Sequence, residues 1–175
     1  MKSILTTIAT LLLLAQQDQA PLIRSADLFL LTGPRWTGTL TYLDYSTNRK
    51  VSIPSTLQVT PVEGQTLSFN FDYQYPDEPH ARSTSTLTIT ADGKEFAGAR
   101  IVERRGGSAS GPLILVMEKM GSDNDREALI RHTYQIETGQ IASGQSRSGR
   151  LSIRKEVRYT GSTQFLLRNE YVWQR

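Results

Sequence analysis

Residues 33–55, GPRWTGTLTYLDYSTNRKVSIPS, predict two antiparallel strands joined by a turn. Successive side chains of a strand point to opposite faces, so alternation indicates one packed face and one wet face. One face of the first strand carries Trp36, Gly38, Leu40, Tyr42 and Asp44. Residues 46–48 (STN) supply turn chemistry, because their short polar side chains bond nearby backbone groups. Alternation resumes at Val51, and Pro54 indicates a bulge, an edge or a strand end. The stretch therefore predicts the opening hairpin of an antiparallel sheet.

Alternating runs continue to the end of the chain. The clearest is 64–75, whose apolar and aromatic residues share one face. These residues are Leu67, Phe69, Phe71, Tyr73 and Tyr75. Asp92-Gly93 is a strong hairpin signal, because it permits the positive φ angles of a two-residue turn. The remaining predicted strands are 83–91, 94–104, 113–119, 127–137, 140–147, 151–159 and 165–174.

About ten short strands with tight turns predict an up-and-down sheet, and closure removes edges that would aggregate. The face expected to point outward is polar, unlike the apolar band of an outer-membrane barrel. Its residues include Ser68, Asn70, Asp72, Gln74, Arg168 and Glu170, whereas Phe165 is expected to point inward. The prediction is therefore an all-β, closed, water-soluble barrel of about eight to ten strands with an apolar interior. A two-sheet β-sandwich is the alternative.

One short helix is predicted at 25–32, before the first strand. Ser25 is the expected N-cap, Asp27 lies near the helix start, and Gly33-Pro34 ends the helix. The apolar residues expected to cover one end of the barrel are Leu28, Phe29 and Leu31.

The N-terminal segment 1–15 has the pattern of a signal peptide. Lys2 gives it a positive start, and the apolar run that follows is shorter than the ~20 residues of a membrane span. Cleavage is expected after Ala15, or as late as Ala20. A buried N-terminal helix is the other interpretation. The pattern predicts an exported protein, periplasmic or extracellular, without a transmembrane segment in the mature chain and with a single barrel domain at 25–175.

Composition agrees with one exported domain. The chain has 175 residues, 20 lysines and arginines against 17 acidic residues, and no cysteine. The domain must therefore be stable without disulfides, and a lipid anchor through an N-terminal cysteine is excluded. Basic residues interleave with acidic ones, as in Arg154-Lys155-Glu156, instead of forming a stripe. Nucleic-acid binding is not expected from such a distribution.

The pattern of Gly33, Trp36 and Gly38, after a short helical segment and before a meander of strands, resembles the calycin superfamily of lipocalin-like and fatty-acid-binding-like barrels. Lipocalins have one residue between the glycine and the tryptophan, whereas this chain has two. The chain is also similar to small secreted bacterial barrels that open with a tryptophan strand. The resemblance implies a small ligand inside the barrel. It also implies a late arginine, here Arg168 or Arg175, packed over the tryptophan.

The predicted inner faces combine aromatic rings with polar groups. A barrel of this size can hold one ligand, and buried charges need a partner or a polar ligand group. The candidate ligand-binding residues are Tyr42, Phe69, Phe71, Tyr73, Arg100, His132, Tyr134, Lys155, Asn169 and Tyr171. Arg100 and Lys155 are candidates to hold a carboxylate head, as arginine does in fatty-acid-binding-like barrels. The competing interpretation places the charges at the rim and fills the barrel with the rings alone. The favoured hypothesis is a carrier or sensor of a small apolar or amphipathic molecule.

An enzyme is a second hypothesis. It would use His132 as acid or base, with Asp44, Glu118 or Glu137 as partner. The chain has no nucleophile elbow, and two histidines without cysteine make a poor zinc set. No catalytic residue, cofactor or metal is therefore predicted.

A third hypothesis is an envelope protein that binds another protein through the loops 76–82 and 105–112. A further loop, 121–125, contains Asp123, Asn124 and Asp125. It lacks the spacing and final glutamate of a calcium loop and is expected to be a solvated turn.

Overall fold

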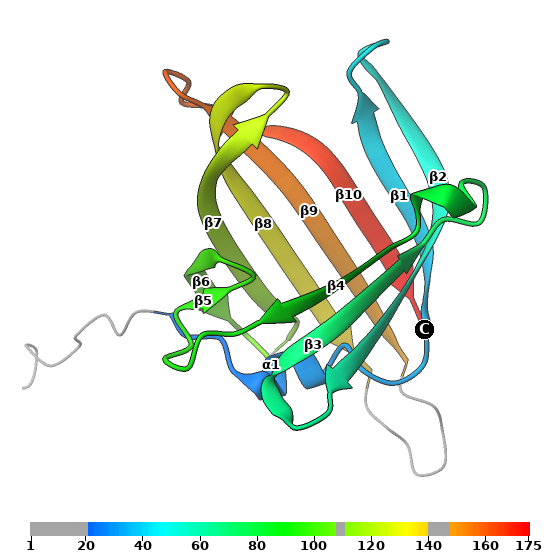
Figure 1. The fold of residues 1–175 in the computed structure, drawn as a ribbon, viewed down its shortest axis with the longest axis vertical. Helices are drawn as coiled ribbons and strands as arrows, with labels where there is room; N and C mark the ends of the chain where they lie inside the picture. The colour runs from blue at the N-terminus through cyan, green and yellow to red at the C-terminus, as the bar shows by residue number, and fades with distance from the viewer. Residues whose placement is uncertain (1–20, 108–110, 140–147) are drawn as a thin grey trace, which may run out of the picture.

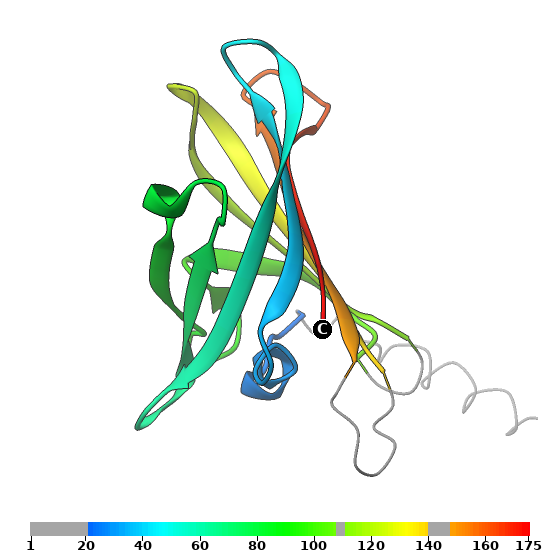
Figure 2. The ribbon, with the colours of Figure 1, turned by 90° about the vertical axis from the view of Figure 1, so that its right-hand side faces the viewer.

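The computed structural model describes residues 21–107, 111–139 and 148–175. In this part of the chain, ten antiparallel strands form one up-and-down sheet that curls into a nearly closed barrel, with one short α-helix at its end (Figures 1 and 2). The predicted barrel is confirmed, and the two-sheet sandwich is not formed. The strand predicted at 140–147 and the signal peptide predicted at 1–15 lie outside the described residues.

The elements follow one another along the chain as a meander. The helical elements are α1 (Ser25–Phe29) and the 3₁₀ turn η1 (Pro79–Ala81). The strands are β1 (Trp36–Asp44), β2 (Arg49–Val62), β3 (Gln65–Gln74), β4 (Ser83–Thr88), β5 (Glu95–Phe96), β6 (Ala99–Arg105), β7 (Leu113–Asp123), β8 (Arg126–Thr138), β9 (Gly149–Tyr159) and β10 (Leu166–Gln174).

Two contacts close the sheet into a barrel. β1 pairs with β10 from Thr37↔Gln174 to Tyr42↔Asn169, and β4 approaches β5 at a single bridge between Ile89 and Phe96. β6 reaches β7 only as far as Glu118. Beyond that point, the far part of β7 pairs with β8 alone among the described strands. The barrel is thus tightly paired at the end where α1 lies and looser at the end where the β1–β2, β7–β8 and β9–β10 turns project (Figure 1).

Large side chains fill the barrel at the α1 end. Trp36, Trp173, Phe69 and Phe71 are fully buried there, together with Leu28 and Leu31 beside them. The predicted inner face of β3 is therefore confirmed at its central positions. Burying a side chain of this size stabilises the fold by about 1.5–3 kcal/mol relative to its exposure.

The helix α1 covers this end, but it ends at Phe29 instead of residue 32, and two further details of its prediction are wrong. Its N-cap is Arg24, so Ser25 is already helical, and the Asp27 carboxylate accepts the backbone N–H of Arg24 at 2.9 Å. Asp27 also pairs with Arg104 of β6 at 2.7 Å, which ties the helix to the sheet. Phe29 is 45% exposed and touches Phe69 edge-on, because only Leu28 and Leu31 face the core.

The predicted strand at 94–104 is broken by a turn, and this reverses the faces expected for β6. Ala97 and Gly98 both have positive φ angles, 55° and 70°. Ala99 and Ile101 are consequently buried, while Arg100 is exposed opposite Glu118 of β7. The prediction that Arg100 faces the interior is therefore wrong.

Two more predictions are wrong because β10 contains a β-bulge. The pairing with β9 steps from Leu167↔Glu156 to Asn169↔Lys155, so Arg168 is the extra residue. A bulge lets consecutive residues break the alternation of faces. Arg168, expected outside, has only 10% of its side chain exposed and binds Asp123. Phe165, expected inside, instead lies under the guanidinium groups of Arg131 and Arg158.

Other local predictions fare unevenly. β2 continues through Pro54, which lies where β2 pairs with β1 but before its pairing with β3 begins at Thr56. Pro54 therefore lies at a local edge of the sheet, which is one of the three positions predicted for it from the sequence. Ser68, expected to be outward and wet, is buried with its hydroxyl 3.0 Å from that of Thr88. β7 extends to Asp123 through residues predicted to form a loop.

No helix in the described ranges is long and apolar enough to span a membrane.

Candidate functional site

Two hollows occupy the looser end of the barrel. The inner chamber has a volume of about 290 Å³ and is lined by residues of every strand from β3 to β10. The mouth cavity has a volume of about 710 Å³ and opens beside the β1–β2 turn. Lys155 and Asn169 line both, so the two hollows adjoin.

Seven of the ten predicted ligand-binding residues line these hollows. They are Tyr42, Tyr73, His132, Tyr134, Lys155, Asn169 and Tyr171. Apolar neighbours such as Leu87, Met117 and Ile153 complete the chamber wall. The structure thus brings together predicted residues from β1, β3, β8, β9 and β10.

The other three predicted residues lie elsewhere. Phe69 and Phe71 are fully buried in the packed end of the barrel, where Phe71 touches the Tyr73 and Phe96 rings. Arg100 points outward for the reason given above. Phe69 and Phe71 therefore fill the barrel, as the competing interpretation expected of the aromatic rings.

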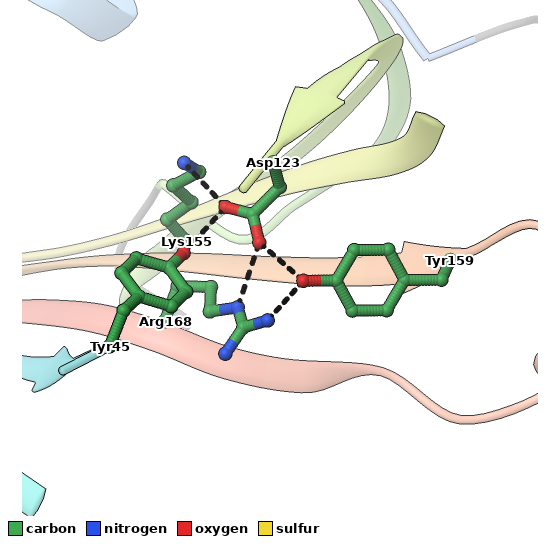
Figure 3. Close-up of polar contacts among 5 residues, drawn as sticks. All are labelled: Tyr45, Asp123, Lys155, Tyr159 and Arg168. Atoms are coloured by element: carbon green, nitrogen blue, oxygen red, sulfur yellow. Dashed lines mark hydrogen bonds and ion pairs between the residues drawn. The ribbon is translucent and has the colours of Figure 1, made fainter. Parts of the chain in front are cut away.

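A polar cluster around Asp123 borders the mouth cavity (Figure 3). One carboxylate oxygen accepts the Tyr45 hydroxyl at 2.8 Å and lies 3.3 Å from the Lys155 ammonium. The other accepts the Tyr159 hydroxyl at 2.8 Å and Nε of Arg168 at 3.0 Å. Arg168 also donates to the Tyr159 hydroxyl. The Asp123 cluster, as we call these five residues, joins the ends of β1, β7, β9 and β10.

The Asp123 side chain is only 2% exposed, yet it remains ionised. Burial by itself would raise the pKa of Asp123. Hydrogen bonds from Tyr45 and Tyr159 and the charges of Lys155 and Arg168 outweigh that effect and hold the pKa below its usual value. The same contact acts oppositely on Tyr45, where burial and the bond to Asp123 raise the pKa to about 12. Both groups therefore keep their charge states across the physiological pH range.

Sequence reasoning missed most of this cluster. It placed Asp123 in a solvated turn, Arg168 on the outer face, and gave no role to Tyr45 or Tyr159. The turn itself is correct, since Asn124 and Asp125 have positive φ angles of 50° and 59°. Asp123 is the last residue of the preceding strand and points inward. Partners 32 to 78 residues away leave no local pattern to detect.

Positive charge flanks His132 in the inner chamber. Lys155 lies opposite His132 across β8–β9, and Lys119 of β7 lines the same hollow. Burial, and then the charges of Lys155 and Lys119, lower the pKa of His132 to about 4. Burial raises the pKa values of Tyr73, Tyr134 and Tyr171. At neutral pH the chamber therefore holds a neutral imidazole, neutral phenols and two ammonium groups.

The acid–base partners considered for His132 are engaged elsewhere. Asp44 accepts bonds from Ser46 and Thr47 in the β1–β2 turn. Glu118 pairs with Arg131 at 2.6 Å, and Glu137 accepts a bond from Gln135. In the described ranges, no group of three or more acidic or histidine side chains is placed to hold a metal ion.

Of the two loops suggested for protein recognition, the structure describes one in full and the other in part. The loop 76–82 contains η1 and borders the mouth cavity through Glu78 and Ala81. The loop 105–112 is described only in part, because 108–110 fall outside the described residues.

Arg175 packs over Trp36, with its Cζ atom 4.0 Å from the ring centroid. It also donates to the carbonyl oxygens of Leu30 and Thr32, each at 2.7 Å. The Trp36 indole donates to the Leu31 carbonyl at 2.8 Å. Of the two arginines that the calycin resemblance offered for this place, Arg175 occupies it, while Arg168 belongs to the Asp123 cluster.

No protein-family model matches the chain, and no curated protein matches its sequence. The fold and the site define a single-sheet antiparallel barrel that is packed at one end and hollow at the other.

Proposed function

We propose that this barrel binds a small amphipathic molecule in the inner chamber and the mouth cavity. The observation that carries the proposal is the division of the barrel interior: the α1 end is filled by side chains, and the opposite end has two adjoining hollows. Ligand cavities typically measure about 300–1,000 Å³ and are mainly apolar with a few convergent polar groups. The chamber and mouth cavity have this size and this mixed lining.

The proposal places an apolar part of the ligand against Leu87, Met117 and Ile153 and a polar part near Lys155 and Asn169. We also propose that the protein acts after export, on the strength of the N-terminal sequence pattern. The calycin resemblance agrees with both parts, and the position of Arg175 over Trp36 supports it.

Binding of N-phenyl-1-naphthylamine, a neutral dye that fluoresces in apolar surroundings, tests the proposal. We expect saturable binding of one dye per chain. Leu87→Trp puts a bulky indole ring in place of a smaller aliphatic side chain in the chamber and is expected to weaken binding about tenfold, which corresponds to about 1.4 kcal/mol. Thr86→Trp is the matched control, because Thr86 is the exposed neighbour on β4. Absent binding, or equal loss in both variants, would refute interior binding.

A further inference from the structure

The charges around the inner chamber are unevenly distributed. Its described lining contains the ammonium groups of Lys119 and Lys155 and no carboxylate. The mouth cavity is lined by the carboxylates of Asp44 and Glu78 as well as by Lys155 and Arg168, so its positive charges are balanced by negative ones. Near the chamber, Asp123 offsets only part of the positive charge, because Lys155 and Arg168 both pair with it. An anionic group is therefore favoured in the chamber over the mouth cavity.

His132 lies within this positive region. Across β7–β8 it faces Met117, with Lys119 two residues further along β7, and across β8–β9 it faces Lys155. The other titratable groups of the chamber lining are the phenols of Tyr73, Tyr134 and Tyr171, contributed by β3, β8 and β10. Burial keeps these phenols neutral. The two lysines are thus the charges that oppose protonation of His132 from within the chamber.

We propose that the chamber holds the anionic group of its ligand between Lys155 and Lys119, and that His132 takes up a proton from solvent when that anion binds. The inference rests on the proposed function and specifies the ligand as an anionic amphiphile. The anion offsets the field of the two ammonium groups, and the protonated imidazole then offers it a further charged hydrogen-bond donor. The ligand is held more tightly in acid and released as the pH rises.

The direction of the pH dependence follows from the linkage between anion binding and proton uptake. In the free protein the pKa of His132 is about 4. A nearby negative charge raises it toward the ordinary value of 6.5. Proton uptake on binding means that anion affinity is lowest above the pKa of the complex and increases as the pH falls toward the pKa of the free protein. Each unit by which the anion raises the pKa increases affinity in acid by about tenfold.

Two dyes that differ by one sulfonate test the coupling. N-phenyl-1-naphthylamine is neutral, and 1-anilinonaphthalene-8-sulfonate is the same molecule with a permanent negative charge. Between pH 8 and pH 4.5, with the fold monitored by circular dichroism, we expect the affinity for the sulfonate to rise by about tenfold. The affinity for the neutral dye is expected to stay flat. His132→Gln is expected to abolish the rise, so that the affinity for the sulfonate no longer changes between pH 8 and pH 4.5.

Lys119→Met is expected to weaken binding of the sulfonate several-fold more than it weakens binding of the neutral dye. Lys119 is exposed, so this variant keeps the fold intact. Lys94→Met, which removes an exposed lysine from the β4–β5 turn, is the charge control. In the wild-type complex, the His132 ring resonances in nuclear magnetic resonance are expected to titrate at least one pH unit higher than in the free protein, with His80 as the reference.

The outcomes separate the two proposals. Failure of both dyes to bind refutes the proposed function and this inference together. Binding of the neutral dye without an acid-dependent preference for the sulfonate overturns this inference alone. Persistence of the acid-dependent rise in His132→Gln, or an unchanged His132 titration in the sulfonate complex, overturns it as well.

Discussion

Asp123→Asn is expected to destabilise the protein strongly while preserving the shape of the side chain. The Asp123 carboxylate is 2% exposed and has contacts with Lys155 and Arg168, whose side chains are 28% and 10% exposed. The amide leaves two partly buried cations without their counter-charge, and it turns an N–H toward groups that are themselves donors. Removing one partner of a buried ion pair costs about 3–5 kcal/mol, and we take about 3 kcal/mol for the isosteric change. For a domain of this size that corresponds to a fall in Tm of about 6–12 °C.

Urea denaturation at pH 7, followed by tryptophan fluorescence, measures the loss. Asp125→Asn is the matched control, because it removes a carboxylate two residues away in the same turn. Asp125 is exposed and has a φ angle of 59°, a conformation that asparagine accepts. The control is expected to change stability by less than about 0.5 kcal/mol. Equal effects of the two substitutions would refute the role assigned to the Asp123 cluster.

The same variant has a predictable pH dependence. The pKa of Asp123 is held below its ordinary value of 3.8 in the folded state. Its ionised form therefore stabilises the fold above pH 3.8, and this contribution is lost as the pH falls through the folded-state pKa. The stability difference between the wild type and Asp123→Asn should narrow in that acid range. A difference that stays constant would mean that the charge of Asp123 does not contribute.

Three further changes test the packed end of the barrel. Phe71→Ala is expected to cost about 3–5 kcal/mol in urea denaturation, against less than about 0.5 kcal/mol for the exposed Thr86→Ala. Arg175→Met keeps an apolar chain over the indole but loses the bonds to the carbonyls of the segment that follows α1. It should lower stability by about 1–3 kcal/mol without shifting the emission of the tryptophans to that of exposed rings. Gly38→Ala puts a Cβ 2.0 Å from the Val172 carbonyl oxygen and is expected to prevent β1–β10 pairing. Gly64→Ala, which meets nothing within 4 Å but has a φ of 71°, is expected to cost only about 1 kcal/mol; a similar loss in both variants, measured by thermal denaturation, would contradict the close approach.

The sequence predicts the barrel well wherever strands run without interruption. The alternation of side chains places Phe69, Phe71 and Tyr134 inside, and all three are buried. This prediction depends on regular alternation, so a single extra residue reverses the faces that are predicted beyond it. The Ala97-Gly98 turn reverses it for Arg100, and the bulge at Arg168 reverses it for Phe165.

The candidate site is only partly encoded in local patterns. His132, Lys155 and Asn169 could be proposed because each interrupts an apolar face of a regular strand. The Asp123 cluster could not, because its members meet only after β1, β7, β9 and β10 are assembled. From the sequence alone, Asp123 cannot be distinguished from an ordinary turn residue, because all of its partners are distant along the chain.

The pairing of β1 with β10 affects how the nascent chain folds. All other neighbouring pairs among the described strands are consecutive in the sequence, so their hairpins can form as soon as they emerge. The free border of β1 must wait for the final strand and is meanwhile a template for pairing with other molecules. Protection of that border by a chaperone, or folding at low concentration, would therefore favour closed barrels over aggregates.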